Sequence, residues 1–239
     1  MKEPSREAAV GVVLAAGLGT RVGADGNKAY LPLAGRSMVT WSLDALTRVS
    51  DVTRTVLVFR RGERELAERT VADELPDATV EFVEGGDSRH ASEFNVLRYL
   101  AADIDAGAID IVLIHDAARP MAGPDMFVTA ITVAREFGGA IPALILADVV
   151  RSAPNGLECA SGAAGLVRVQ TPQAFRALPL LQAYRAAERE RFEGTDTSSC
   201  VEKYADLDVR TFSGQELNLK VTYAHDIAVA ERLLTDDRR

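Results

Sequence analysis

Residues 10–21 form the stretch that decides the fold: Val10-Gly11-Val12-Val13-Leu14-Ala15-Ala16-Gly17-Leu18-Gly19-Thr20-Arg21. Its first half is a short apolar run of the kind that forms a strand buried on both faces, and its second half is a turn rich in glycine and alanine. In an open parallel sheet, ligands bind where the strands end at their carboxyl side. The first place to look for a binding site is therefore this turn.

Further apolar runs follow along the chain and alternate with segments of helical periodicity. The runs are Thr55 to Phe59, Thr79 to Val83, Ile109 to His115 and Gly139 to Ala147. Between them apolar residues recur at steps of three and four, as at Met38, Trp41, Ala45 and Val49. This alternation predicts an α/β fold, a single Rossmann-like and mostly parallel sheet flanked by helices. No linker or internal repeat divides the sequence, so we expect residues 1–239 to form one domain.

Residues 148–165 break this alternation. Arg151, Pro154, Asn155 and Gly156 lie in a segment whose glycines and proline exclude a continuous helix. The segment is therefore predicted to leave the sheet as a protruding arm. Because such an arm rarely stays solvated along its whole length, we expect it to pack on a second subunit.

The charge balance excludes several classes of partner. The chain carries 27 Lys and Arg against 35 Asp and Glu, a formal charge of -8 and a pI near 5.0. This balance disfavours binding to nucleic acid or to an anionic membrane, and an anionic substrate needs a local cationic pocket. Cys159 and Cys200 have no metal-ligand spacing and suit a reducing compartment. With no long apolar stretch in the sequence, we expect a soluble cytoplasmic protein.

The glycine-rich turn has the composition of an anion site, because consecutive backbone N–H groups can surround a phosphate. Gly23 is not followed by the Lys and Ser/Thr of a P-loop. Leu18 to Asn27 is too poor a helix former for a dinucleotide fingerprint, which also disfavours an NADP-dependent reductase. Arg21 and Lys28 flank the glycines, as expected around a triphosphate. A tight turn with two solvated cations remains the alternative.

The same residues resemble the opening signature of the sugar-phosphate nucleotidylyltransferases, which is Ala15-Ala16-Gly17 followed by Gly19, Arg21 and Lys28. Further blocks narrow the resemblance to the 2-C-methyl-D-erythritol 4-phosphate cytidylyltransferase family, in colinear order from about Val10 to Leu234. These blocks are Gly85-Gly86-Asp87-Ser88-Arg89 with Ser92, His115-Asp116-Ala117-Ala118-Arg119-Pro120, Gln170-Thr171-Pro172-Gln173 and Asn218-Leu219-Lys220-Val221-Thr222.

The resemblance implies an enzyme that transfers CMP from CTP to 2-C-methyl-D-erythritol 4-phosphate and releases pyrophosphate, in the non-mevalonate synthesis of isoprenoid precursors. Arg21, Lys28 and Lys220 would be the catalytic cations that counter charge on the triphosphate and the α-phosphorus. Asp116 would bind Mg²⁺ and contribute to substrate binding. From the residues alone, Asp116 could instead cap the next segment.

The resemblance also implies a homodimer interlocked through residues 148–165, and a set of binding residues. The nucleotide would be bound by Ala15, Ala16, Gly17, Gly19, Gly86, Asp87, Ser92 and Ala117. Backbone groups can distinguish a cytosine edge from a uracil edge because donor and acceptor are exchanged. Arg119, Arg151 and Thr171 would bind the acceptor, although Arg119 could instead order the loop after Asp116. From the residues alone, Asp87 or Ser88 would be the N-cap of a helix. His115, which has apolar neighbours, would be a packed residue of a strand.

The sequence departs from the family mainly on the acceptor side. Val149 stands where the family usually has Thr, and Ala163 where it has an arginine that grips the acceptor's phosphate. A missing guanidinium weakens such binding by about 1.5–3 kcal/mol. Asn27 and Ala29 flank Lys28 where Pro and Gln are common. Two alternatives therefore stay open: a paralogue that acts on another polyol phosphate, such as a pentitol phosphate, and a catalytically weak CTP-binding protein.

Overall fold

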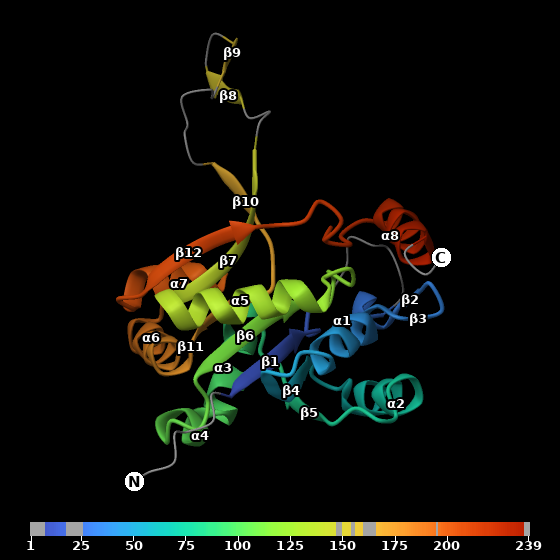
Figure 1. Cartoon of the computed structure of the whole chain (residues 1–239), viewed down its shortest axis with the longest axis horizontal. Helices are drawn as coiled ribbons and strands as arrows, with labels where there is room; N and C mark the ends of the chain where they lie inside the picture. Colours follow the sequence, from blue (N-terminus) through green and yellow to red (C-terminus); the bar gives the residue numbers. More distant parts are fainter. Residues whose placement is uncertain are drawn as a thin grey trace.

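The computed structural model describes residues 8–17, 26–146, 150–153, 156–159, 166–194 and 196–236. Within these ranges the chain forms an eight-stranded sheet between two layers of helices (Figure 1). The strands are β1 (Ala9–Leu14), β4 (Val52–Phe59), β5 (Val80–Glu84), β6 (Ile111–Asp116), β7 (Gly138–Ile145), β10 (Val167–Val169), β11 (Gln173–Arg176) and β12 (Asp208–Ser213). The α/β fold and the mostly parallel sheet predicted from the sequence are confirmed.

The sheet has the order β10-β7-β11-β6-β1-β4-β5, and β12 pairs with β7. Strands β6, β1, β4 and β5 run parallel, and β12 is parallel to β7. No sequence pattern indicated the antiparallel strands: β11 lies between β6 and β7 and is antiparallel to both, and β10 is antiparallel to β7. The carboxyl ends of β1, β5 and β6 therefore meet at one edge.

Helices cover both faces of the sheet because successive strand residues point to opposite sides. The helices are α1 (Met38–Thr47), α2 (Arg64–Glu74), α3 (Arg89–Tyr99), α4 (Ala101–Asp105), α5 (Pro124–Phe137), α6 (Ala177–Glu190), α7 (Thr197–Tyr204) and α8 (Ala224–Asp236). On β1, Ala9 and Val13 pack with α1, α2 and α5, whereas Val10 and Val12 pack with α3, α4, α6 and α7. Both core layers are almost fully buried.

A third, smaller cluster connects the two ends of the chain. Leu33 in β2 (Pro32–Leu33), which pairs with β3 (Arg36–Ser37), packs with Ala118, Val221 and α8. This contact carries the segment before α8 across the carboxyl edge of the sheet, so that residues near 220 lie beside β1 and β6.

The predicted arm contains a separate hairpin, β8 (Val150–Ala153) with β9 (Gly156–Cys159), which Figure 1 draws well away from the central sheet. Val149 and Ala163 lie outside the described residues. Among the helices of the described part, none has the length and apolar character needed to span a membrane.

Candidate active site

A cavity of about 410 Å³ lies at the carboxyl ends of β1, β5 and β6. This is the edge at which open parallel sheets bind their ligands. The predicted site residues that line it are Ala15, Ala16, Gly17, Lys28, Gly86, Asp87, Ser92, Asp116, Ala117 and Lys220. The fold thus brings together residues that lie up to about 200 positions apart in the sequence.

The turn between β5 and α3 packs directly against the turn after β1, and this contact requires glycine. A Cβ on Gly85 would lie 2.5 Å from the Ala16 Cβ, and a Cβ on Gly86 would lie 2.4 Å from the Ala91 Cβ. Real Cβ atoms do not approach so closely. A larger residue at position 85 would push the two turns apart, and one at position 86 would distort the β5–α3 turn against the start of α3. Backbone, with few side chains, therefore forms this wall of the cavity.

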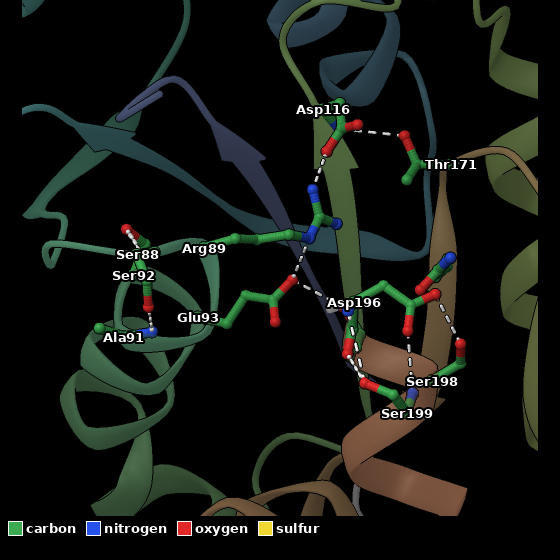
Figure 2. Close-up of polar contacts among 12 residues, drawn as sticks. Ser88, Arg89, Ala91, Ser92, Glu93, Asp116, Thr171, Asp196, Ser198 and Ser199 are labelled. Atoms are coloured by element: carbon green, nitrogen blue, oxygen red, sulfur yellow. Dashed lines mark hydrogen bonds and ion pairs between the residues drawn. The ribbon is translucent and has the colours of Figure 1, made fainter. Parts of the chain in front are cut away.

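Hydroxyl groups hold the β5–α3 turn in its shape. Ser92 Oγ accepts a hydrogen bond from the Gly86 N–H at 3.0 Å and donates to the Ser88 carbonyl at 2.8 Å. Ser88 Oγ accepts from the Ala91 N–H at 3.1 Å and is the N-cap of α3 (Figure 2). The helix cap predicted at Ser88 or Asp87 is confirmed at Ser88, while the Asp87 side chain is exposed.

The turn after β1 offers only part of its backbone to a ligand. The Ala15 N–H donates to the Val58 carbonyl at 2.8 Å, and the Ala15 carbonyl accepts from Asn27 Nδ2 at 2.6 Å. Within the described ranges, no acceptor is bound to the N–H groups of Ala16 and Gly17. The donors that this turn can present to a ligand are therefore those of Ala16 and Gly17.

Asp116 ends β6 and is held between two cations. Arg89 Nη1 contacts Asp116 Oδ1 (Figure 2). On the other side, Lys220 Nζ lies 2.6 Å from Asp116 Oδ2. Burial alone would raise the pKa of the Asp116 carboxyl group, but Arg89 and Lys220 more than offset burial and hold this pKa well below its usual range. Asp116 is therefore ionised at every physiological pH.

Arg89 is itself fixed from the core side by Glu93, one helical turn further along α3. Arg89 Nε lies 3.0 Å from Glu93 Oε1, close enough for an ion pair but without the alignment of a hydrogen bond. Glu93 also accepts hydrogen bonds from the Tyr184 hydroxyl and, at 2.8 Å, from Thr197 Oγ1. A chain of polar contacts thus runs from Glu93 in the core through Arg89 and Asp116 to Lys220 at the cavity. Figure 2 shows the part of this chain from Glu93 to Asp116.

His115 and Thr171 hold the backbone of Asp116 in place through a series of hydrogen bonds. Burial lowers the pKa of His115 to about 4, so the imidazole is neutral. Its Nε2 lies 3.1 Å from the Arg119 carbonyl, which can only accept, so Nδ1 must accept from Thr171 Oγ1 at 3.1 Å. Thr171 Oγ1 in turn accepts from the Asp116 N–H at 3.0 Å. The expectation that His115 is a packed strand residue is confirmed, and Thr171 is buried beside it.

The remaining predicted residues lie elsewhere or outside the described chain. Arg119 Nη1 donates to the Asn218 carbonyl at 2.8 Å and so connects the loop after Asp116 to the segment that carries Lys220. Arg151 belongs to β8, but its side chain lies outside the described part. Gly19 and Arg21 also lie outside the described residues.

Two polar cavity residues, Arg89 and Asn27, were given no role by the sequence. Arg89 stands in one of the quoted blocks, and its spacing of four from Glu93 after the Ser88 cap is a signal that places both on one helix face. Asn27 stood out only as a departure from the family. The contacts of Asn27 join segments that lie far apart in the sequence, and no local sequence pattern predicts these contacts.

The residues present fit a magnesium ion that is bound together with phosphates. Among the residues that the structure describes, no group of three or more His, Cys, Asp or Glu is placed to hold a metal. Mg²⁺, however, commonly binds one or two carboxylates and takes its other ligands from substrate phosphates and water. Each Asp116 oxygen keeps a further lone pair besides its cation contact, so Asp116 can supply one such ligand.

Comparison with known proteins gives a consistent result. Residues 9–236 match the family model of IspD, 2-C-methyl-D-erythritol 4-phosphate cytidylyltransferase. The enzyme of that name from Cereibacter sphaeroides is 39% identical over 224 residues, which cover 93% of this chain and 95% of the relative. The one from Geobacillus kaustophilus is 36% identical over 225 residues, with the same coverage.

Solved structures of proteins with the same activity are similar to this chain in fold. The 4-diphosphocytidyl-2C-methyl-D-erythritol synthase of Anaerococcus prevotii superposes with a TM-score of 0.81 at 25% identity, covering 96% of both chains. The 2-C-methyl-D-erythritol 4-phosphate cytidylyltransferase of Thermus thermophilus superposes with a TM-score of 0.71 at 26% identity, covering 95% of this chain and 98% of that one.

Proposed function

The chain belongs to the 2-C-methyl-D-erythritol 4-phosphate cytidylyltransferase family, and from this premise we propose how its cavity carries out cytidylyl transfer. The protein is an enzyme that transfers CMP from CTP to 2-C-methyl-D-erythritol 4-phosphate. A phosphate oxygen of the acceptor forms a bond to the α-phosphorus of CTP, and the bond from that phosphorus to the β-phosphate bridging oxygen breaks. Pyrophosphate leaves with the electron pair of that bond, and the pathway is isoprenoid precursor synthesis.

One observation carries the mechanism: two glycine-containing turns and an ionised carboxylate held between cations border the same cavity. The nucleophile is already anionic, so the protein needs no nucleophile of its own. Positioning of the two substrates and neutralisation of charge are sufficient for this chemistry. Hydrogen bonds from the backbone turns can position the substrates, and lysine ammonium groups can neutralise the phosphate charge.

The turns after β1 and β5 form the proposed binding site for the nucleotide, called the nucleotide seat below. Ala16 and Gly86 line the cavity where the two turns pack together, and their small side chains leave backbone groups open to a base. The N–H groups of Ala16 and Gly17 are donors for the base or the phosphates. Asp87 and Ser92 complete the seat, with Ser92 acting through the turn that it holds.

Lys28 and Lys220 are the proposed cations at the triphosphate, and Arg21 is expected to join them. Lys28 begins the short helix η2 (Lys28–Tyr30), and its ammonium donates to the Val221 carbonyl at 2.9 Å, one residue from Lys220. Asp116 is the residue that would hold Mg²⁺. When bound, this ion supplies further neutralisation of phosphate charge.

The family match favours 2-C-methyl-D-erythritol 4-phosphate over another polyol phosphate as the acceptor. Arg119, Arg151 and Thr171 remain proposed acceptor residues. Thr171 would act through Asp116, to whose N–H it is bound.

The protein is further proposed to be a cytoplasmic homodimer joined through the arm. In support, the end of β7, strand β10 and the residue before it expose apolar side chains at the base of the arm: Ile145, Leu166, Val167 and Val169.

Pyrophosphate release tests the proposal. The protein is incubated with CTP or UTP, Mg²⁺, and either 2-C-methyl-D-erythritol 4-phosphate or a pentitol phosphate, and the nucleotide product is identified by mass. We expect fastest release with CTP and the methylerythritol phosphate. Faster release with the pentitol phosphate would reassign the acceptor. Binding of CTP without release with either acceptor would favour a nucleotide-binding protein, and no heat on titration with CTP and Mg²⁺ would overturn the site itself.

A further inference from the structure

Asn27 is a buried side chain whose two N–H donors are both used. It is 6% exposed, and Nδ2 donates to the Ala15 carbonyl at 2.6 Å and to Glu63 Oε2 at 2.8 Å. Oδ1 accepts from the Ala29 N–H at 3.0 Å, which makes Asn27 the N-cap of η2. An asparagine amide has two donors and one acceptor oxygen, so its donor capacity is exhausted here.

Two of these three contacts are with residues that border the cavity, and the third is with the start of α2. Ala15 begins the turn after β1, Ala29 is the neighbour of Lys28, and Glu63 stands at the start of α2. Glu63 is held in turn by an ion pair with Arg60, just beyond the end of β4. Because Glu63 is anchored, the Asn27 amide has a fixed direction relative to the sheet.

The contact with Ala15 also orients the next N–H group. The Ala15 carbonyl and the Ala16 N–H belong to one planar trans peptide unit and point in opposite directions. The Ala15 N–H belongs to the preceding peptide unit and is already bound to the Val58 carbonyl. The Ala15–Ala16 peptide can still rotate about the Ala15 Cα–C bond unless its carbonyl is held. By holding the carbonyl on its own side, Asn27 turns the Ala16 N–H away from itself.

We propose that Asn27 is a positioning residue for base selection, which fixes the Ala15–Ala16 peptide so that the Ala16 N–H meets a base acceptor. The inference rests on the proposed function, because it takes the cavity as the nucleotide site. Cytosine carries an unprotonated N3 acceptor where uracil carries an N3–H donor. A rigid N–H therefore favours cytosine, and a peptide free to rotate can offer its carbonyl to uracil instead.

Asn27→Asp is the sharpest test, because the replacement has the same shape and keeps an acceptor for the Ala29 N–H but loses both donors. The double variant Asn27→Asp/Glu63→Gln guards against a fold failure, since the second substitution removes the repulsion between two carboxylates without restoring a donor to Ala15. The dissociation constants of CTP and UTP with Mg²⁺ are measured by calorimetry, together with kcat/KM for each nucleotide. We expect the preference for CTP over UTP to fall roughly 10-fold in both variants, the scale of one hydrogen bond.

A control separates positioning from loosening of the structure. Glu74→Gln changes a matched carboxylate far from the cavity, one that accepts from the Ser37 N–H and Thr40 Oγ1 at 2.7 Å each. This substitution should change the affinities for CTP and UTP by the same factor, so that the preference between them stays as in the wild type.

The outcomes distinguish this inference from the proposed function. A folded Asn27→Asp or double variant with an unchanged CTP preference would overturn the inference, even if the wild type turns over CTP and the methylerythritol phosphate. A wild type that binds CTP in preference to UTP but forms no product would overturn the proposed reaction, while a lost preference in the variants would still support the role of Asn27.

Discussion

Lys220 is the more exposed of the two cations that hold Asp116, at 41% of its side-chain surface against 26% for Arg89. Its ammonium can therefore follow a bound triphosphate while Arg89 stays on Asp116. We expect Lys220→Met to lower kcat by about 10²–10³, the scale for removing one charge from a developing phosphoryl transition state. The fold should persist, because Arg89 still compensates the buried carboxylate. Steady-state kinetics and thermal unfolding measure both effects.

Lys203→Met is the matched control for this substitution. Lys203 also lies near a carboxylate, with its Nζ 3.9 Å from Glu190, and it packs on the Phe192 ring, remote from the cavity. Its removal should leave kcat unchanged. Equal loss of activity in the two variants, or full activity of Lys220→Met, would contradict the role of Lys220.

Glu93 makes the stability of the protein depend on pH in an unusual direction. Burial raises the pKa of Glu93 against the opposing effects of Arg89, Tyr184 and Thr197. The folded state therefore holds this proton to a higher pH than the unfolded chain, whose glutamates titrate near ~4.3. The stabilisation from protonated Glu93 is complete below that value and is lost as the pH rises through the folded pKa.

The variant Glu93→Gln isolates this contribution because glutamine does not titrate. We expect the free energy of unfolding of the wild type, minus that of the variant, to fall as the pH rises above about 4.3. Denaturant unfolding of both proteins at a series of pH values measures the difference. A difference that stays constant or grows with pH would show that the partners of Glu93 outweigh its burial.

Single residues also mark the limit of what the sequence could predict about the site. Lys28, Asp116 and Lys220 stand in blocks that resemble a known family, so their presence at one cavity could be expected. Arg89 and Asn27 act through contacts with Glu93, Glu63 and the Ala15 carbonyl, and such contacts exist only once the chain has folded. Motif spacing therefore identifies charged groups at the ligand more readily than the groups that orient them.

At the scale of elements, strands buried on both faces were predictable and short inserted strands were not. Continuous apolar runs lie in β1, in β6 up to Ile114 and in β4 from Val56 to Phe59, which is the pattern of a central parallel strand. Strand β11, Gln173–Arg176, has four residues and no alternation, and its antiparallel place between β6 and β7 follows from long-range pairing. Four residues are too few to display a period.

The β5–α3 turn gives a prediction at the same scale. Gly86→Ala would put a Cβ 2.4 Å from the Ala91 Cβ in the first turn of α3, so the turn must move away from the cavity wall. We expect the affinity for CTP to fall roughly 10-fold or more, as for a lost polar contact at a specific site, while the thermal unfolding midpoint changes little. Calorimetric titration with CTP and Mg²⁺ measures the affinity.

Gly123→Ala is the control for the added methyl group. Gly123 is the N-cap of α5, and a Cβ there would meet nothing within 4 Å. Its affinity for CTP should equal that of the wild type. Wild-type affinity in Gly86→Ala would mean that the β5–α3 turn does not form part of the nucleotide seat.

At the scale of the whole molecule, four of the exposed large apolar side chains of the described residues lie where the arm leaves the sheet: Ile145, Leu166, Val167 and Val169. Ile145 at the end of β7 is 87% exposed, and its register partner Val167 in β10 is also exposed. Apolar patches of this kind on a soluble protein mark interaction surfaces. A second copy of the chain is the expected partner, because two-fold homodimers are the commonest oligomers and the arm beside the patch has a surface of its own to bury.

Light scattering across micromolar concentrations tests this assembly. We expect the wild type to have twice the 25.7 kDa mass of the chain, and Ile145→Asp/Val167→Asp to have the mass of one chain, because two carboxylates cannot be buried unpaired in an apolar interface. Val229→Asp changes an exposed valine of α8, away from the arm, and should remain dimeric. A wild type of one chain mass at every concentration would reject the dimer, and a double variant that stays dimeric would move the interface to another face.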